Sequence, residues 1–328
     1  MGKRIISIVP FTEDQKKTLK SIASSYGDEL DFMEKADSDQ LKKEIRTADA
    51  IIGNIDPDLL SGAENLSWLQ LNSAGVDNYV KPGAVPEKTT ITCASGSYGT
   101  AISEYMVAML LVMMKKIPLY LKNQEAGLWR DEGSVASPAG KKILVVGTGD
   151  IGLSFARRIK VFELPDHPIR LVGVRRRTDT VPEPLDEIHS LDELPGLVKE
   201  ADVIALSLPG TQATYHLFDK KLLSQCKKGS YLINVGRGSV IENEALKDPE
   251  VYGRFAGIYI DVCEREPLPD HDPLYAVPNL YITPHITGFY HLDITLQRIA
   301  EIAEHNMKAW HGEGQFVSRV NRSTGYAD

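Results

Sequence analysis

The sequence is poor in cysteine and in positive charge. Its three cysteines, Cys93, Cys226 and Cys263, are odd in number and lack Cys-x-x-Cys spacing. We therefore expect no disulfide framework and no bound metal. Acidic residues number 45 against 37 Lys and Arg, which leaves a formal net charge of -8. A nucleic-acid or anionic-membrane partner needs a basic surface, so neither is expected.

Long hydrophobic runs are also missing. The longest, residues 105–114, is bounded by Glu104 and Lys115 and is shorter than a membrane span. The apolar N-terminal run at residues 5–9 is too short for a signal peptide and fits a first β-strand. These absences predict a cytoplasmic protein.

The composition is otherwise globular, with 42% hydrophobic and 25% charged residues. A chain of 328 residues exceeds one ordinary domain, so two domains are expected. In residues 1–98, expected strands alternate with expected helices, which is typical of βαβ units and a parallel sheet. The strands are predicted at 5–9, 30–33, 50–53 and 68–71, and the helices at 13–25 and 38–47.

The middle of the chain is expected to form a buried helix followed by an irregular arm. Thr100 can N-cap a helix that continues through the apolar run to residue 114. A helix that is apolar nearly all round must be buried, either between domains or between subunits. Residues 117–140, with Trp129 and Arg130, are expected to be either a surface excursion or an arm that clasps a second subunit.

The second block has the size of a doubly wound dinucleotide-binding domain. Its six strands are predicted at 143–146, 169–174, 203–208, 231–235, 257–262 and 280–283. After the first of them, residues 147–152 spell Gly-x-Gly-x-x-Gly and lead into an apolar helical period. Glycines here permit a tight turn and close approach of the backbone to a pyrophosphate, which the helix N-terminus attracts. The strand–turn–helix context favours dinucleotide binding over a plain structural turn.

Three other strand ends carry polar side chains. Arg237 stands between two glycines and suits a carboxylate or carbonyl ligand, although a salt bridge to a neighbouring loop is the alternative. Asp261 and Glu266 follow the next strand, and His285 follows the last one. Because parallel strands end at one edge of the sheet, we expect these groups near the dinucleotide crevice.

Taken together, these motifs resemble the D-isomer-specific 2-hydroxyacid dehydrogenases over essentially the whole chain. The resemblance rests on residues 71–77 (Leu-Asn-Ser-Ala-Gly-Val-Asp), 147–152, 207–211 (Ser-Leu-Pro-Gly-Thr), 234–238 (Asn-Val-Gly-Arg-Gly), 261–267 and 284–285. It implies an acid/base role for His285, a substrate-binding role for Arg237, and a His-supporting role for Glu266. Glu264 lies nearby, but Glu266 directly precedes Pro267 as the family motif requires.

The resemblance also implies the architecture: an α/β protein with two domains, each a parallel sheet with flanking helices. Residues 99–288 would form a Rossmann-type cofactor domain. Residues 1–98 and 289–328 would form a discontinuous, flavodoxin-like substrate domain, closed by a helix over residues 292–310 that packs back on the first block. A homodimer is implied as well.

Further site residues follow from their match to the family motifs. The backbone of Ala74 and Gly75 is expected to hold the substrate carboxylate. Tyr98 is expected beside the substrate, with core packing as the alternative. Residues expected to bind the dinucleotide are Gly147, Thr148, Gly149, Asp150, Ile151, Leu208, Pro209, Thr214, Val235, Asp261 and Gly288.

The strand after the glycine turn indicates which dinucleotide is preferred. An NAD site has an acid about 20 residues past the fingerprint, where it binds the ribose 2′-hydroxyl. Here that strand ends in Arg175, Arg176, Arg177 and Thr178. We expect Arg175, Arg176 and Thr178 to bind a 2′-phosphate, which favours NADP and leaves NAD possible. A solvated basic turn is the alternative.

The expected activity is hydride transfer between NAD(P)H and a small 2-keto or D-2-hydroxy acid. A phosphoglycerate-type dehydrogenase is one alternative, weakened because no regulatory domain follows residue 312 in this sequence. Formate dehydrogenases of the family lack the glutamate at position 266. A corepressor-like protein that senses the dinucleotide without turnover is the alternative from another class.

Overall fold

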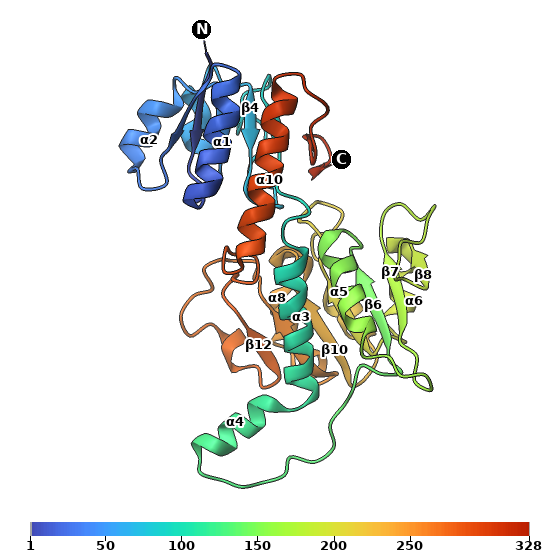
Figure 1. Ribbon diagram of the computed structural model, residues 1–328. Coiled ribbons are helices and arrows are strands. Elements are labelled where there is room, and N and C mark those ends of the chain that lie inside the picture. The colour runs from blue at the N-terminus through green and yellow to red at the C-terminus, as the bar shows by residue number, and fades with distance from the viewer. Residues whose placement is uncertain (1, 328) are drawn as a thin grey trace. The chain divides into compact units, whose positions relative to one another are not determined.

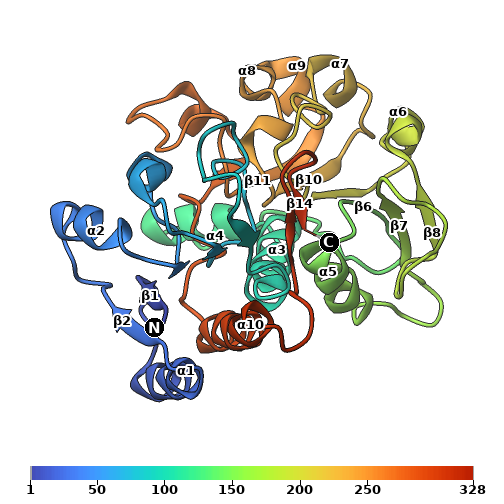
Figure 2. The same cartoon turned by 90° about the horizontal axis from the view of Figure 1, so that it is seen from above.

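The structure is a computed structural model that describes residues 2–327 (Figures 1 and 2). It divides into two compact units: Met1–Tyr98 with Tyr290–Asp328, and Gly99–Phe289. Within the described part of the chain, no helix combines the length and the apolar character needed to cross a bilayer.

The first unit is built on a five-stranded parallel sheet in the order β2-β1-β3-β4-β5. Its strands are β1 (Arg4–Ser7), β2 (Glu29–Phe32), β3 (Ala50–Ile52), β4 (Trp68–Gln70) and β5 (Thr90–Thr92). This is the flavodoxin-like strand order. The sequence predicted the first four strands and missed β5, which is three residues long and lies at the edge of the sheet.

Helices from both ends of the chain cover this sheet. They are α1 (Glu13–Ser25), α2 (Ser38–Ile45) and α10 (Asp293–Trp310), with a 3-10 helix η1 (Pro57–Gly62) and a C-terminal hairpin of β13 (Val320–Asn321) and β14 (Tyr326–Ala327). Thr12 and Gln15 form a capping box that begins α1. As predicted, α10 packs back on this unit, against α1 and β4 (Figure 1). The buried amide of Asn306 on α10 donates to Oε1 of Gln70 at 2.8 Å.

The second unit is a doubly wound domain. Its seven parallel strands lie in the order β12-β11-β10-β9-β6-β7-β8. They are β6 (Lys142–Val146), β7 (Arg170–Val174), β8 (Glu187–His189), β9 (Val203–Leu206), β10 (Ser230–Asn234), β11 (Phe255–Ile260) and β12 (Leu280–Ile282). The direction of winding reverses between β6 and β9, and ligands bind at such a switch point. The expected number of six strands is wrong because β8, a polar edge strand, carries no apolar run.

Ten helices and 3-10 turns accompany this sheet within the described residues. The longer helices are α3 (Gly99–Met114), α4 (Ile117–Glu125) and α5 (Asp150–Lys160), and α3 packs against α5 and β11. The short helices are α6 (Leu194–Leu197), α7 (Lys220–Leu223), α8 (Asn243–Leu246) and α9 (Pro249–Tyr252). The 3-10 turns are η2 (Leu191–Glu193), η3 (Gly238–Val240) and η4 (Pro273–Ala276).

Two predictions about the middle segment are corrected. The first helix begins at Gly99, so Thr100 lies inside it and is not its cap. The amide of Gly99 instead donates to the carboxylate of Asp150 at 2.7 Å. Residues 117–140 are not irregular throughout, because Ile117–Glu125 is helical with Pro118 in its first turn. Proline is tolerated there because the first-turn N–H groups have no helical acceptor.

Candidate active site

The glycine turn of the second unit is shaped by close backbone contacts. Gly147 has φ +96°, and its amide donates to the carbonyl of Val174 at 2.9 Å. A Cβ on Gly152 would lie 2.0 Å from the carbonyl oxygen of Gly147, so only glycine fits there. Gly149 precedes α5 and supplies no side-chain cap. The first N–H groups of this helix therefore suit an external anion.

Polar groups around this turn fit a dinucleotide. Among residues 2–327, the buried Oγ1 of Thr148 has no hydrogen-bond partner, which is unusual for a buried hydroxyl and suits a ligand contact. Asp150 and Ile151 open α5, but the carboxylate of Asp150 is held by the Gly99 amide. Only the backbone at these two positions is thus placed to meet phosphate. The site accordingly matches the pyrophosphate-binding turn of a Rossmann domain.

The loop after β9 closes on itself. Thr214 is buried, and its hydroxyl donates to the carbonyl of Pro209 at 2.6 Å and accepts the Thr211 amide at 2.9 Å. The next loop lies close by, since a Cβ on Gly236 would fall 2.5 Å from the carbonyl oxygen of Leu208. Val235 is buried beside it. The side chain of Thr214 therefore shapes the loop, and its hydroxyl is already engaged.

The turn that carries Arg237 is fixed on both sides. Asn234 accepts the Gly236 amide at 3.1 Å and donates to the carbonyl of Arg237 at 3.0 Å. On the other side, a Cβ on Gly238 would lie 1.9 Å from the carbonyl carbon of Cys263. The guanidinium Nη1 donates to the carbonyl of Gly236 at 2.9 Å. The flanking glycines thus allow the tight geometry that the sequence suggested.

Asp261 anchors the loop that follows β12. It is buried, and its carboxylate accepts the amides of Ile286 (3.0 Å) and Thr287 (3.1 Å) and the hydroxyls of Thr283 and Thr287. Its carbonyl also accepts the amide of His285 at 2.8 Å. Its carboxylate is therefore engaged within the protein, where it holds the backbone that presents the histidine. Gly288 follows directly after this anchored loop.

His285 and Glu266 form a hydrogen-bonded pair. Nδ1 of His285 lies 2.6 Å from Oε2 of Glu266, whose Oε1 accepts the Cys263 amide at 2.9 Å. The hydrogen bond to Glu266 raises the pKa of His285, although burial and Arg237 oppose this. Burial alone would raise the pKa of Glu266, but its bonds to His285 and Cys263 outweigh burial and lower it. The pair therefore favours imidazolium beside carboxylate.

The backbone of His285 adopts a left-handed conformation, with φ +53°. Such a conformation is uncommon for a residue other than glycine and is held by surrounding contacts, here those with Asp261. Within residues 2–327, the ring of His285 forms its hydrogen bond through Nδ1. Nε2 is therefore the ring atom left for a substrate.

Glu264 has a different partner. Its Oε1 pairs with Nε2 of His216, and its Oε2 accepts the amide of Asn243 at 2.8 Å. The ring of Tyr215 stacks on His216 with centroids 4.0 Å apart. Glu264 and Glu266 therefore have different histidine partners, although they are only two residues apart. Sequence reasoning missed His216 because no motif links it to a residue 48 positions away.

The basic turn, residues 175–178, follows directly after β7, which ends at Val174. The Arg175 amide donates to the carbonyl of His189, the last residue of β8, at 3.0 Å. Arg175 is half-buried, whereas Arg176 and Thr178 are exposed. No acidic residue occupies this strand end, so the turn suits an anion.

In the first unit, the segment around Ala74 and Gly75 is a rigid bend. The hydroxyl of Ser73 donates to the carbonyl of Gly75 at 2.6 Å, and within residues 2–327 the amides of Ala74 and Gly75 donate no hydrogen bond. Asn72 and Asn54 exchange backbone-to-side-chain hydrogen bonds of 2.7 and 3.0 Å. The two amides are therefore well placed to receive an anion.

Two tyrosines meet beside this bend. The hydroxyl of Tyr98 donates to the carbonyl of Asn72, and the Asn72 side chain donates to Tyr290. Burial raises the pKa of both phenols, that of Tyr290 to about 12. Both hydroxyls therefore stay neutral at physiological pH. Tyr98 is largely buried, so most of its ring surface is covered by packing within the protein.

Comparisons with known proteins show which family this chain resembles in sequence and fold. A sequence profile described as "D-isomer specific 2-hydroxyacid dehydrogenase, NAD binding domain" matches residues 107–287. A glyoxylate reductase from Thermofilum pendens is 31% identical, over 83% of this chain and 80% of that protein. A glyoxylate/hydroxypyruvate reductase B from Pectobacterium atrosepticum is 31% identical, over 75% of this chain and 78% of its own. A D-isomer specific 2-hydroxyacid dehydrogenase family protein from Aeromonas salmonicida has a similar crystal structure, with TM-score 0.82, 28% identity, and coverage of 98% of this chain and 100% of that one.

Proposed function

The chain belongs to the D-isomer specific 2-hydroxyacid dehydrogenase family, and we propose that His285, Glu266 and Arg237 provide its acid/base and substrate-binding groups. It is an oxidoreductase that transfers a hydride between a nicotinamide dinucleotide and a small 2-keto or D-2-hydroxy acid. When bound, the dinucleotide supplies or accepts the hydride. The protein must hold the substrate and move a proton at the substrate oxygen.

The hydrogen bond between His285 and Glu266, at 2.6 Å, is the observation that carries this proposal. Because Nδ1 is engaged with the carboxylate, Nε2 exchanges the proton with the substrate oxygen. In the reducing direction the imidazolium donates, and the raised pKa of His285 favours this protonated form. In the oxidising direction the neutral ring accepts the proton from the hydroxyl group.

Arg237 binds the substrate carboxylate or carbonyl oxygen through its guanidinium. Two parallel N–H groups fit a carboxylate, and the positive charge offsets negative charge that develops on the carbonyl oxygen. The support is the rigid turn, in which Asn234 binds the backbone on both sides of Gly236. In the first unit, the backbone amides of Ala74 and Gly75 donate hydrogen bonds to a substrate carboxylate, and Tyr98 contacts the substrate.

NADP is the proposed dinucleotide. Arg175, Arg176 and Thr178 bind its 2′-phosphate, and the absence of an acid at the end of β7 supports this choice over NAD. The pyrophosphate is held by the backbone of residues 147–151 and the hydroxyl of Thr148, which has no partner among residues 2–327. Leu208, Pro209, Val235 and Gly288 supply the backbone around the dinucleotide.

The substrate is a 2-keto acid of the size of glyoxylate or hydroxypyruvate, the compounds in the names of the reductases to which the chain is similar. Oxidation of NADPH, followed by absorbance with a panel of small 2-keto acids, tests this. Turnover of a member of the panel supports the reductase. A protein that binds NADPH but turns over none of the panel would instead behave as a dinucleotide sensor.

A homodimer is the proposed assembly, formed by the second unit through α3 and the segment that follows it. Trp129 is fully exposed, and Leu121 and Leu128 are 54% and 51% exposed. Val107 and Ala108 on α3 line an apolar groove with Val161 and Phe162. Apolar surface of this kind marks an interface. A light-scattering mass twice that of the chain supports the dimer, and a monomeric mass contradicts it.

A further inference from the structure

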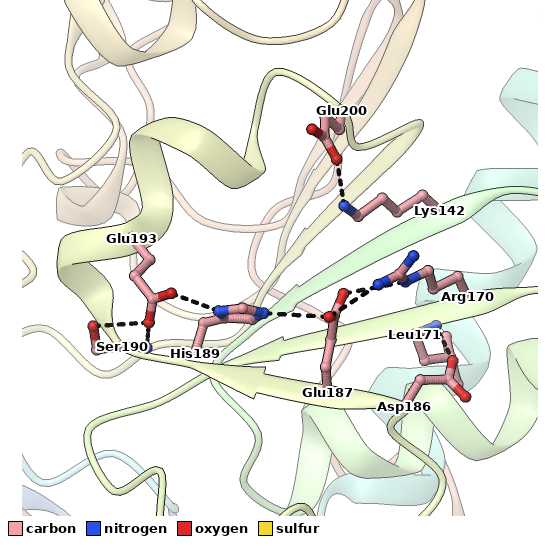
Figure 3. Close-up of polar contacts among 9 residues, drawn as sticks. All are labelled: Lys142, Arg170, Leu171, Asp186, Glu187, His189, Ser190, Glu193 and Glu200. Atoms are coloured by element: carbon pink, nitrogen blue, oxygen red, sulfur yellow. Dashed lines mark hydrogen bonds and ion pairs between the residues drawn. The ribbon is translucent and has the colours of Figure 1, made fainter.

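The edge strand β8 is held by a row of alternating charges (Figure 3). Arg170 on β7 binds Glu187 through two nitrogens, Nε at 3.2 Å and Nη2 at 3.1 Å. Nε2 of His189 lies 3.5 Å from the same Glu187 carboxylate. On its other side, Nδ1 of His189 lies 2.7 Å from Oε2 of Glu193 in η2. The imidazole therefore stands between two carboxylates.

Glu193 also fixes the chain that leaves the strand. Its Oε1 accepts the amide of Ser190 at 3.0 Å and the hydroxyl of Ser190 at 3.3 Å. Within residues 2–327, Nε2 has no hydrogen-bond partner, so its contact with Glu187 is an ion pair that exists only when the ring carries a second proton. The hydrogen bond to Glu193 raises the pKa of His189, with a further contribution from Glu187. The charged ring is thus the form that binds Glu193 in η2 through Nδ1 and at the same time faces the Glu187 carboxylate of β8 through Nε2.

This strand sets the start of the basic turn. β8 pairs only with β7 in the described sheet, and His189 is the register partner of Val174, the residue before the turn. The carbonyl of His189 accepts the amide of Arg175 at 3.0 Å. A shift of β8 would therefore release the first residue of the turn. Besides this bond, Arg170 binds Glu187, and Asp186 exchanges hydrogen bonds with the backbone of Leu171, so His189 completes a set of contacts that hold the register of β8.

We propose that His189 is a positioning residue for recognition of the 2′-phosphate of the dinucleotide, because its charged ring holds the carbonyl that fixes Arg175. The inference rests on the proposed preference for NADP. His189 itself does not touch the phosphate. Its influence is therefore specific to ligands that carry the 2′-phosphate, and ligands without that group are expected to bind as before.

The charge on His189 makes this recognition dependent on pH. Because the folded-state pKa of His189 is raised, the ring is charged at low pH and loses its proton as pH rises through that value. The groups that face it, Glu187, Glu193 and, through Glu187, Arg170, keep their charges over the same interval. A 2′-phosphate loses its second proton near pH 6, so its charge is constant above about pH 7.5. A preference for the 2′-phosphate that weakens as pH rises further is therefore attributed to loss of the proton from His189.

Calorimetric titration of the whole protein with 2′,5′-ADP and with 5′-AMP tests the proposal, and the ratio of the two dissociation constants is the readout. We expect His189→Leu to weaken 2′,5′-ADP about tenfold and to change 5′-AMP less than about twofold. His189→Lys keeps a positive charge between the carboxylates and is expected to retain most of the preference. The control Glu200→Gln removes the ion pair with Lys142 (2.7 Å) on a neighbouring strand and should leave the ratio unchanged.

The results separate this inference from the cofactor proposal. If the unmodified protein does not prefer 2′,5′-ADP, the proposed NADP preference is wrong, and this inference is wrong with it. If it does prefer 2′,5′-ADP but His189→Leu keeps the ratio, or weakens both ligands equally, only the inference is wrong. The unmodified protein gives a second check: a preference for 2′,5′-ADP that does not fall as the His189 ring loses its proton, followed by NMR of the imidazole, also contradicts the inference.

Discussion

Glu266, and not Glu264, is the carboxylate hydrogen-bonded to His285, with 2.6 Å between Oε2 and Nδ1. Glu264 is only two residues away, yet it binds His216 and the amide of Asn243. Glu264 and Glu266 are thus each paired with a different histidine of the second unit. They give a natural pair of variants for testing which carboxylate supports the acid/base histidine.

Replacing Glu266 by Gln should lower the pKa of His285, because the hydrogen-bonded carboxylate is the main cause that raises it. Reduction needs the protonated ring, so activity is present below this pKa and is lost as pH rises through it. We expect kcat/KM for reduction to fall about 10- to 100-fold near neutral pH, with its upper pH limit moved to lower pH. The pH profile of kcat/KM is the measurement.

The matched control is Glu264→Gln, which should leave that pH profile in place. An equal shift in both variants would mean that the effect comes from general surface charge and not from the hydrogen bond. An unshifted profile in Glu266→Gln would remove Glu266 from the proposed supporting role.

Arg237→Lys should reduce kcat/KM by about 100-fold, because an ammonium group cannot form two parallel hydrogen bonds to a carboxylate. The charge is retained, so a large loss would identify geometry as the important property. Steady-state kinetics with a reactive keto acid give the value, and circular dichroism checks the fold. A loss of less than about threefold would show that Arg237 does not bind the substrate.

The double variant Arg175→Ser, Arg176→Ser should lower kcat/KM with NADPH by at least about tenfold while NADH changes little. The reason is that only NADPH carries the 2′-phosphate. Kinetics with both cofactors measure the ratio, and Arg177→Ser serves as the control on the same exposed turn. A clear preference of the unmodified protein for NADH would contradict the assignment of this turn.

Gly152→Ala should destabilise the second unit by about 1–3 kcal/mol, because the new Cβ would lie 2.0 Å from the carbonyl oxygen of Gly147. Gly196→Ala is the control, since a Cβ at that helical position meets nothing within 4 Å. We expect the control to be neutral or stabilising by about 0.4–1 kcal/mol. Urea denaturation of both variants tests the difference, and equal stability would contradict the close contact.

Much of the fold could be predicted from local patterns. Most strands are buried apolar runs, and the turn at Gly147 to Gly152 has a local geometric requirement, so both are visible in the sequence. β8 could not be predicted, because an edge strand with polar side chains carries no hydrophobic signal. α4 was missed because Pro118 resembles a helix breaker, although it stands in the first turn.

The sequence suggested candidate site residues from their motifs, but it could not predict their contacts. Sequence order says nothing of the pairing of Glu264 with His216, which depends on how the loops after β9 and β11 meet. The hydrogen bonds of the Asp261 carboxylate to Thr283, Ile286 and Thr287, which hold the loop of His285, were likewise not visible in the sequence. Such side-chain pairings depend on tertiary structure and have no local signal.

The central claim is that His285 exchanges the proton with the substrate. The most direct measurement is kcat/KM for NADPH-dependent reduction of a reactive 2-keto acid by His285→Asn, with NADPH affinity measured in parallel by fluorescence. Removing the acid/base group should lower kcat/KM by about 10²- to 10⁴-fold and leave NADPH binding nearly unchanged. If the variant binds NADPH normally and keeps near-normal kcat/KM, His285 is not the acid/base residue.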